Sequence, residues 1–217
     1  MKPEGETRMP VPASHHMVES QLRARGISDP RVLDAMLRVP RPEFVPENFR
    51  AEAYEDHPLP IGDGQTISQP YVVALMLELL QLQATDIVLE IGTGSGYVTA
   101  LLAELAVQVY SIERHAALAR GALRRLSALG HSNAQVLTAD GTLGLPDHAP
   151  FDAILVSAAT PEIPPPLIHQ LREGGRLIIP VGPADSQQLQ LIRLRNGKPL
   201  VSILDPVRFV PLISETE

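Results

Sequence analysis

Apolar residues recur at helical spacing in the first part of the chain. The ranges 17–26 and 29–40 repeat them every three or four positions and end at a glycine and a proline, which are common helix stops. The second range also opens with Asp29 and Pro30, a typical N-cap and first-turn pair. Residues 41–69 are rich in proline and irregular. We therefore expect two helices followed by an ordered layer over the domain.

From about residue 70 onward, short apolar strands alternate with helical patterns. This order is typical of a parallel sheet covered by helices on both faces. The expected strands are 86–91, 107–113, 134–139, 151–158 and 176–182, and the expected helices are 71–80, a segment ending near 105, 115–130 and 163–175. The range 187–204 alternates around Asn196-Gly197, which is a strong hairpin signal. An antiparallel pair should complete the sheet.

Length and composition favour one folded unit. The chain has 217 residues, of which 44% are hydrophobic, and this is enough to bury one full core. Residues 1–13, rich in Pro, Glu and Gly, predict a flexible leader. We expect a single α/β domain over 14–217, with 14–69 as a helical and irregular cap and 70–217 as a Rossmann-like core.

Charge and residue content argue against several classes of partner. A net charge of −7 gives no global support to phosphate-backbone binding, so we expect no nucleic-acid partner. The chain has no cysteine, and its seven histidines show no metal-ligand spacing, so we expect no metal site. No apolar run approaches the roughly 18 residues of a membrane span, and the start lacks the apolar region of a signal peptide. We expect a cytoplasmic monomer.

A glycine loop follows the first expected strand of the core, in "VLEIGTGSGY". Gly92, Gly94 and Gly96 lie between a buried strand and a helix, where glycine lets the backbone approach a ligand closely. The spacing differs from that of dinucleotide dehydrogenases, and Glu90 sits just before the first glycine. This combination resembles the first motif of Rossmann-like S-adenosylmethionine-dependent methyltransferases. A tight turn without a ligand is the alternative.

Two acidic residues follow the next strands. Glu113 lies about twenty residues beyond the glycines, where a carboxylate can accept hydrogen bonds from ribose hydroxyls, although it could also serve only the following helix dipole. Asp140-Gly141 comes directly after the third strand, where the carboxylate could accept from an adenine amino group or form only an Asp-Gly turn. Together with the glycine loop, these residues converge on the crevice where this architecture binds ligands.

The segment "QTISQP" places two hydroxyls, Thr66 and Ser68, directly before an expected helix. Either could simply cap that helix, with Pro70 in its first turn. With "LPIGDGQTISQPYVVALM", "FDAILVSAATPEIP", "QLREGGRLIIPVG" and the tail "VRFVPL", however, the chain resembles the protein-L-isoaspartate (D-aspartate) O-methyltransferase family from about residue 17 to 213. The "QTISQP" and "VRFVPL" segments are specific to that family.

The resemblance implies methyl transfer from S-adenosylmethionine to L-isoaspartyl, and more weakly D-aspartyl, carboxylates in aged proteins and peptides, which starts repair through a succinimide. It makes Ser68 the active-site residue, with an orienting role. A carboxylate is already ionised at neutral pH, so the residue chemistry needs no general base. Methylation of another carboxyl acceptor and a non-catalytic S-adenosylmethionine-binding module are the alternatives.

Three further residues are candidates for the acceptor side. Thr66 could line the same pocket as Ser68 or serve a turn. Ser157, after the fourth strand, would leave room for donor and acceptor, although a buried strand end explains it as well. Val210 could pair with a peptide substrate through its backbone or belong to an edge strand. No large aromatic residue follows Gly141, which predicts an aliphatic wall around the adenine.

Overall fold

The computed structural model describes residues 12–214. One continuous helical segment opens it, made of α1 (Ala13–His16), the π-helical η1 (Met17–Leu22) and the 3-10 helix η2 (Arg23–Arg25). The helix expected from residue 17 thus begins at Ala13, inside the expected leader, whose residues 1–11 lie outside the described part. Helix α2 (Pro30–Arg38) starts as predicted, because the Asp29 carboxylate accepts from the Arg31 N–H at 2.8 Å.

The proline-rich layer contains more regular structure than its sequence suggested. It holds two 3-10 helices, η3 (Arg41–Phe44) and η4 (Glu47–Glu52), and an antiparallel hairpin of β1 (Leu59–Gly62) and β2 (Gln65–Ile67). At the turn, Asp63 and Gly64 have φ of 51° and 70°. An Asp-Gly pair is a recognised hairpin signal, but strands of 4 and 3 residues are too short to show the alternation that would mark them in the sequence.

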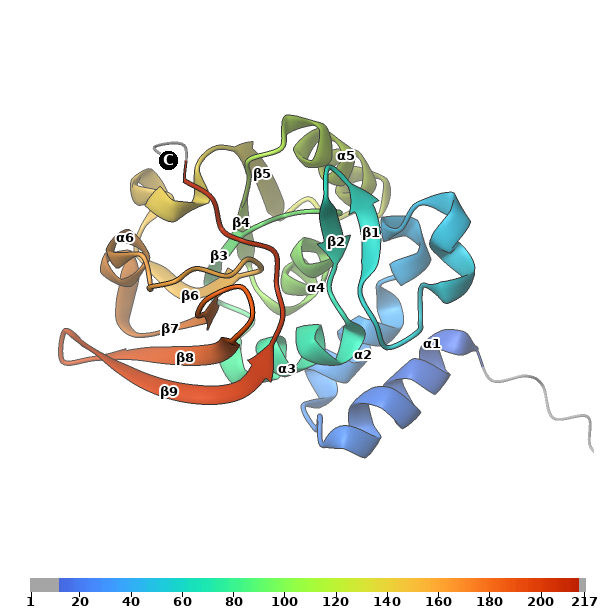
Figure 1. Cartoon of the computed structure of the whole chain (residues 1–217), viewed down its shortest axis with the longest axis horizontal. Helices are drawn as coiled ribbons and strands as arrows, with labels where there is room; N and C mark the ends of the chain where they lie inside the picture. Colours follow the sequence, from blue (N-terminus) through green and yellow to red (C-terminus); the bar gives the residue numbers. More distant parts are fainter. Residues whose placement is uncertain (1–11, 215–217) are drawn as a thin grey trace, which may run out of the picture.

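A seven-stranded sheet forms the centre of the molecule, in the order β5-β4-β3-β6-β7-β8-β9 (Figure 1). The first five are parallel, and β8 and β9 are antiparallel to their neighbours, as predicted. The strands are β3 (Ile87–Ile91), β4 (Gln108–Glu113), β5 (Ala134–Thr138), β6 (Phe151–Val156), β7 (Leu171–Val181), β8 (Gln187–Arg195) and β9 (Lys198–Val207). The remaining helices are α3 (Pro70–Leu80), α4 (Tyr97–Leu105), α5 (Ala116–Ala128), η5 (Gly141–Leu143), η6 (Pro146–His148) and α6 (Pro165–His169).

The prediction of a helix over 163–175 is wrong for the residues after His169. Helix α6 ends at His169, and Leu171 already belongs to β7, where it pairs with Phe151. Gly174 has φ of 78°, a value that glycine adopts freely and that does not fit a right-handed helix. Burial of Leu171 beside β6 and the weak helix propensity of the glycine pair favour the strand.

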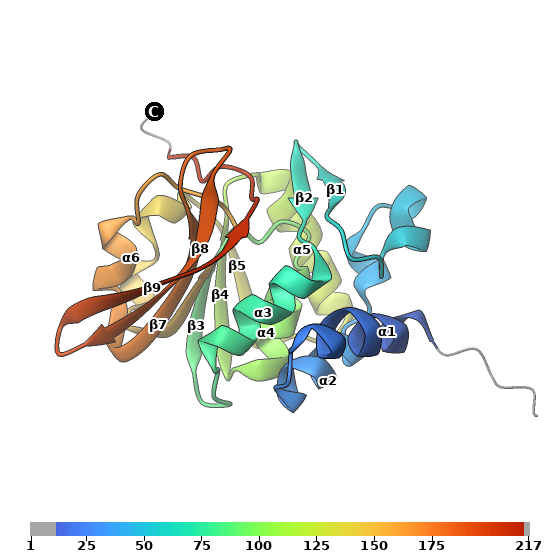
Figure 2. The same cartoon turned by 60° about the horizontal axis from the view of Figure 1, so that its bottom comes forward.

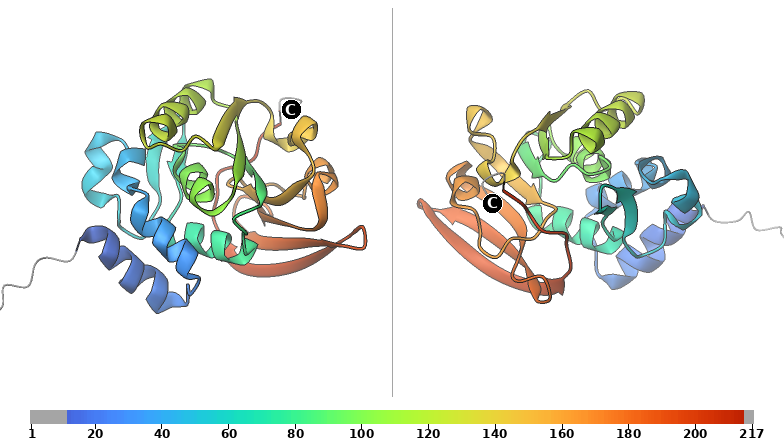
Figure 3. Two further views of the ribbon diagram at one scale, coloured as in Figure 1. Left: turned by 180° about the vertical axis from the view of Figure 1, so that it is seen from behind. Right: turned by 45° about the horizontal axis from the view of Figure 1, so that its top comes forward.

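Alternate strand residues pack into two cores, one on each face of the sheet. In β6, Ala153 and Leu155 join the core under α2, α3 and α4, whereas Ile154 and Val156 join the core on the opposite face, which includes Leu167 of α6. Figures 2 and 3 show α3 and α4 across the sheet from α6. Burial on both faces explains the nearly continuous apolar strands. Within residues 12–214, no helix has the length and apolar character that crossing a bilayer requires.

The strand order reverses beside β3. The chain runs from β3 to β4 and β5 on one side, and then crosses to place β6 on the other. In such sheets a crevice opens at the carboxyl ends of the two strands that flank this switch point. Residues that follow β3, β4, β5 and β6 therefore meet at one end of the sheet.

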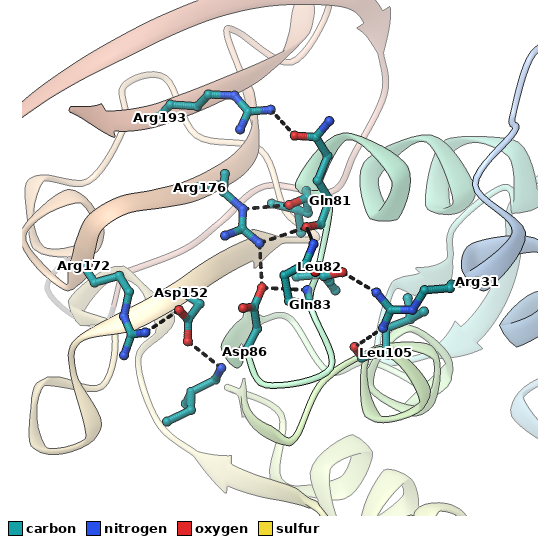
Figure 4. A network of polar contacts seen from close by, with 12 residues as sticks. Arg31, Gln81, Leu82, Gln83, Asp86, Leu105, Asp152, Arg172, Arg176 and Arg193 are labelled. Atoms are coloured by element: carbon teal, nitrogen blue, oxygen red, sulfur yellow. Dashed lines mark hydrogen bonds and ion pairs between the residues drawn. The ribbon is translucent and has the colours of Figure 1, made fainter.

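At the opposite end of the sheet, arginine side chains bind backbone carbonyls (Figure 4). Arg176 donates to the Leu80 carbonyl at 2.7 Å and to the Asp86 carboxylate at 2.6 Å. Arg31 donates to the carbonyls of Leu82 and Leu105. These bonds satisfy backbone carbonyls at or just beyond the carboxyl ends of α3 and α4, which lack partners within the helices.

Candidate functional site

The glycine loop between β3 and α4 depends on glycine for its backbone. Gly92, Gly94 and Gly96 have φ of 93°, 54° and 91°. A Cβ on Gly94 would lie 3.2 Å from Ile61 Cδ1, and one on Gly96 would lie 3.0 Å from Ala122 Cβ. Both contacts are tighter than ordinary van der Waals packing, so the loop is held close to its neighbours. Gly96 also serves as the N-cap of α4.

A cavity that is partly open to solvent lies above this loop at the crevice. We call it the donor cavity. Four of the residues proposed from the sequence for the cofactor line it, namely Gly92, Gly94, Glu113 and Gly141. Glu90, Gly96 and Asp140 are not among its lining residues. The structure thus brings together only part of the expected set.

Glu113 ends β4 with its carboxylate at the donor cavity. Oε2 accepts from the Gly94 N–H and Oε1 from the His115 N–H, each at 2.9 Å. The side chain is buried, and the two bonds fix both oxygens. Because a carboxylate oxygen can accept more than one hydrogen bond, the group can hold the glycine loop and still accept from a ligand hydroxyl.

Asp140 has a structural role beside the cavity. Its Oδ1 accepts from the backbone N–H and the hydroxyl of Thr142, at 2.8 and 2.7 Å, and thereby caps η5. Oδ2 accepts from the Ser214 hydroxyl at 3.2 Å. Asp140 and Thr142 thus form a turn after β5, and Gly141 is the member of the Asp140-Gly141 pair that lines the cavity; the assignment of Asp140 to the adenine stays a prediction.

Glu90 lies beneath the glycine loop. Its Oε2 accepts from the Thr99 and Ser111 hydroxyls, and Oε1 is buried without a partner. Burial raises the pKa of Glu90 to about 8, against the opposing effect of the two hydroxyl donors. The side chain of Glu90 thus bonds to α4 and β4 and supports the loop from below, and its assignment to the cofactor stays a prediction.

A second cavity adjoins the first, and we call it the acceptor cavity. Its other lining residues come from the segment before β1, the start of α3, the end of β9 and the segment after β9, namely Pro58, Gln69, Val72, Pro206, Val207, Arg208 and Phe209. Four residues line both cavities: Thr66, Ser68, Ser157 and Val210. The one catalytic and three substrate-binding residues proposed from the sequence therefore form the wall that the two cavities share.

Neither hydroxyl of the "QTISQP" segment caps α3. The N-cap is Gln69, whose side chain makes no capping bond, and the Tyr71 N–H is bound instead by the Asp56 carboxylate at 3.1 Å. The capping interpretation of Thr66 and Ser68 is therefore wrong. Among the described residues, neither hydroxyl has a hydrogen-bond partner, so both remain available to a ligand at the shared wall.

The C-terminal segment passes over the crevice after β9 (Figure 1). The Val210 carbonyl accepts from Ala159 N–H at 2.7 Å, and Ala159 O accepts from Leu212 N–H at 2.6 Å. The Gln187 side chain bonds both backbone groups of Phe209, at 2.6 and 3.1 Å. The segment forms an isolated bridge rather than an edge strand of the sheet, and the Val210 carbonyl is already engaged.

The donor cavity suits a nucleoside carrying a short charged arm. Its wall is partly aliphatic, with Ile112, Leu212 and Ile213, and Glu113 supplies the acceptor for hydroxyls. A Cβ at Gly92 would make only an ordinary contact with Ser157 Cβ, at 3.5 Å, so the φ of 93° is what favours glycine there. These residues fit S-adenosylmethionine. Within 12–214, no three His, Asp or Glu side chains form a group able to hold a metal ion.

Sequence reasoning missed several lining residues. Arg114 and His115 follow Glu113 directly, and Gln65 precedes the "TIS" hydroxyls, so their position beside recognised motifs was the available signal. The segment from Pro211 to Ile213 also lines the donor cavity, and only the three-dimensional course of the chain end brings it there.

Comparison with known proteins agrees with this site. The family model for protein-L-isoaspartate(D-aspartate) O-methyltransferase matches residues 13–217. Protein-L-isoaspartate O-methyltransferases of Koribacter versatilis and Methanoculleus marisnigri are each 56% identical, over 91% and 92% of this chain and 89% and 90% of their own.

Solved structures of protein-L-isoaspartate O-methyltransferases also resemble this chain. One protein-L-isoaspartate O-methyltransferase superposes with a TM-score of 0.84 at 30% identity, over 91% of this chain and 65% of that one. A Plasmodium falciparum chain described as a beta-aspartate methyltransferase, in complex with S-adenosyl-L-homocysteine, gives 0.81 at 29% identity, over 91% and 97%. The match of the family model over nearly the whole chain and the 56% identity establish that the chain belongs to the protein-L-isoaspartate(D-aspartate) O-methyltransferase family.

Proposed function

We propose that this chain methylates the free carboxylate of L-isoaspartyl residues, and of D-aspartyl residues, in damaged proteins and peptides, across the wall shared by the donor and acceptor cavities. S-adenosylmethionine is the methyl donor, and the product ester starts repair through a succinimide. The observation that carries the proposal is the placement of Thr66, Ser68, Ser157 and Val210 in both cavities.

On the donor side, the backbone of the glycine loop and Gly141 provide close approach, and Glu113 provides an acceptor for the ribose hydroxyls. The contacts of Glu113 with Gly94 and His115 keep its carboxylate in place before the ligand arrives. Glu90, Gly96 and Asp140 act indirectly in this proposal. They fix the loop, the start of α4 and the turn at Gly141, respectively.

On the acceptor side, the substrate brings its own nucleophile. A carboxylate with a pKa near 4 is already ionised at neutral pH, so the chain needs to align it and to exclude water rather than to remove a proton. The unpaired hydroxyl of Ser68 donates to this carboxylate and orients it, while Thr66, Ser157 and Val210 shape the passage. The carboxylate oxygen forms a bond to the methyl carbon as the bond from that carbon to sulfur breaks, and the leaving group is S-adenosylhomocysteine.

A carboxyl methyltransferase for another acceptor and a non-catalytic binding module are less favoured. The acceptor cavity is partly open and lies beside the partly exposed segment 206–210, which gives a peptide chain access. A binding module would not require free hydroxyls at the meeting point of two cavities. We also infer a monomeric enzyme that works in the cytoplasm without a nucleic-acid partner.

The test uses methyl-labelled S-adenosylmethionine and two peptides of identical sequence that contain either an isoaspartyl or a normal aspartyl residue. The expected result is label in the isoaspartyl peptide alone, released by mild base as expected of an ester. Label in both peptides would favour a general carboxyl methyltransferase. Label in neither, with S-adenosylhomocysteine still bound, would favour the binding module.

A further inference from the structure

A buried arginine connects the acceptor segment to the rest of the domain. Arg41, the first residue of η3, is fully buried. Its Nη2 donates to the Ser68 carbonyl at 2.8 Å, and its Nε donates to the Ala53 carbonyl at 2.7 Å. Its guanidinium carbon lies 4.8 Å from the centre of the Tyr97 ring.

This position is costly for a charged side chain. Among the described residues, no carboxylate lies within ion-pair distance of Arg41, although the Asp56 carboxylate favours its charge from farther away, and Nη1 is buried without a hydrogen-bond partner. Burial accordingly lowers the pKa of Arg41. Buried charges without a paired carboxylate are destabilising relative to apolar residues of similar size. The benefit of the guanidinium should therefore lie in what it holds.

What Arg41 holds is the residue at the shared wall. Ser68 lies between the end of β2 at Ile67 and the start of α3 at Pro70, outside both elements. The guanidinium is planar, with Nε held by the Ala53 carbonyl and Nη2 bound to the Ser68 carbonyl. These two bonds fix the direction of the Ser68 carbonyl and so restrict the backbone at the Cα that carries the hydroxyl. Tyr97, packed under the same group, lines the donor cavity at the first turn of α4.

We propose that Arg41 is a positioning residue that aligns Ser68 of the acceptor segment with the donor cavity. It acts through the Ser68 backbone and does not itself line either cavity. This inference rests on the proposed methyl transfer. A purely structural arginine would instead stabilise the fold and leave the rate of methyl transfer unchanged.

Arg31 provides a matched control. It also donates to two backbone carbonyls, those of Leu82 and Leu105, but at the far end of the sheet from the cavities (Figure 4). The experiment compares Arg41→Met and Arg31→Met by kcat and KM for an isoaspartyl peptide, by affinity for S-adenosylhomocysteine and by Tm. Arg41→Met should lower kcat roughly 10- to 100-fold with nearly unchanged cofactor affinity, because small misalignments cost rates of this order. Arg31→Met should lower Tm alone.

A double-mutant cycle separates positioning from general damage. Arg41→Met should cost much less in the Ser68→Ala background than in the wild type, since the hydroxyl that it aligns is already gone. If Arg41→Met does not fold, Arg41→Lys, which keeps one charged donor but no fork, carries the same test with a smaller loss. Additive losses, or an unchanged kcat in a folded Arg41 variant, would overturn the inference. A wild type that is inactive on isoaspartyl peptides would instead overturn the proposed function.

Discussion

The buried Glu90 predicts a pH-dependent stability that one substitution should remove. Its carboxyl group lies beneath the glycine loop, with the Thr99 and Ser111 hydroxyls on Oε2 and no partner on Oε1. Burial raises its pKa to about 8, whereas an exposed glutamate titrates near 4.5. Glu90→Gln keeps one carbonyl acceptor for the hydroxyls and cannot ionise.

The direction in which pH changes the free energy of unfolding follows from how many protons the folded and the unfolded chain bind. Between pH 4.5 and about 8 the folded chain keeps the Glu90 proton that the unfolded chain has lost, so the free energy of unfolding falls as the pH rises. The slope approaches roughly 1.4 kcal/mol per pH unit, and the full interval amounts to roughly 3–5 kcal/mol. The unfolding free energy of Glu90→Gln lacks this pH-dependent contribution. The variant instead buries an amide donor where Oε1 has no partner, at a pH-independent cost of about 1–3 kcal/mol.

The assay is urea unfolding of wild type and Glu90→Gln at pH 5.5, 7 and 8.5. All other titrating groups are shared, so the difference in unfolding free energy isolates Glu90. The variant should be less stable at pH 5.5 and should gain on the wild type by several kcal/mol at pH 8.5. A difference that stays constant across the three pH values would refute the reasoning, because it would mean that Glu90 ionises normally in the folded chain.

Three further substitutions probe the loop and the acceptor segment. Glu113→Ala removes the carboxylate that holds the Gly94 N–H and should weaken S-adenosylhomocysteine binding at least about 10-fold by calorimetry, whereas an unchanged affinity would exclude Glu113 from the site. Gly94→Ala should weaken the same binding, because it forces a side chain at φ of 54° against Ile61 at 3.2 Å, and tight binding would show that the loop tolerates a Cβ. Asp56→Ala removes the carboxylate that binds the Tyr71 N–H, the Gln69 side chain and Arg25, and it should cost about 1–2 kcal/mol of unfolding free energy, whereas an unchanged Tm would mean that the start of α3 needs none of these contacts.

The central architecture could be predicted because local patterns determine it. Strands buried on both faces read as continuous apolar runs, and the glycine loop, Glu113 and Gly141 follow strands whose carboxyl ends must meet at one edge. The hairpin around Asn196-Gly197 was equally clear. At Asn196 the backbone adopts φ of 52°, as such a turn requires.

The rest depended on contacts between residues far apart in the chain. Asp56, rather than a neighbouring Ser or Thr, binds the start of α3, and Gln187 fixes Phe209 near the other chain end. Arg41 reaches the Ser68 carbonyl across 27 positions. No periodicity or local motif marks such pairs, and none marks the Thr99 and Ser111 hydroxyls as partners of Glu90.

The measurement that tests the account most directly is single-turnover methyl transfer to an isoaspartyl peptide by wild type and Ser68→Ala, with both substrates saturating. The Ser68 hydroxyl makes no hydrogen bond within the described structure, so the substitution should leave Tm and S-adenosylhomocysteine affinity unchanged. Loss of a hydrogen bond to the acceptor carboxylate should slow transfer roughly 10- to 100-fold. An unchanged transfer rate would contradict the assignment of Ser68 to the wall across which the methyl group passes.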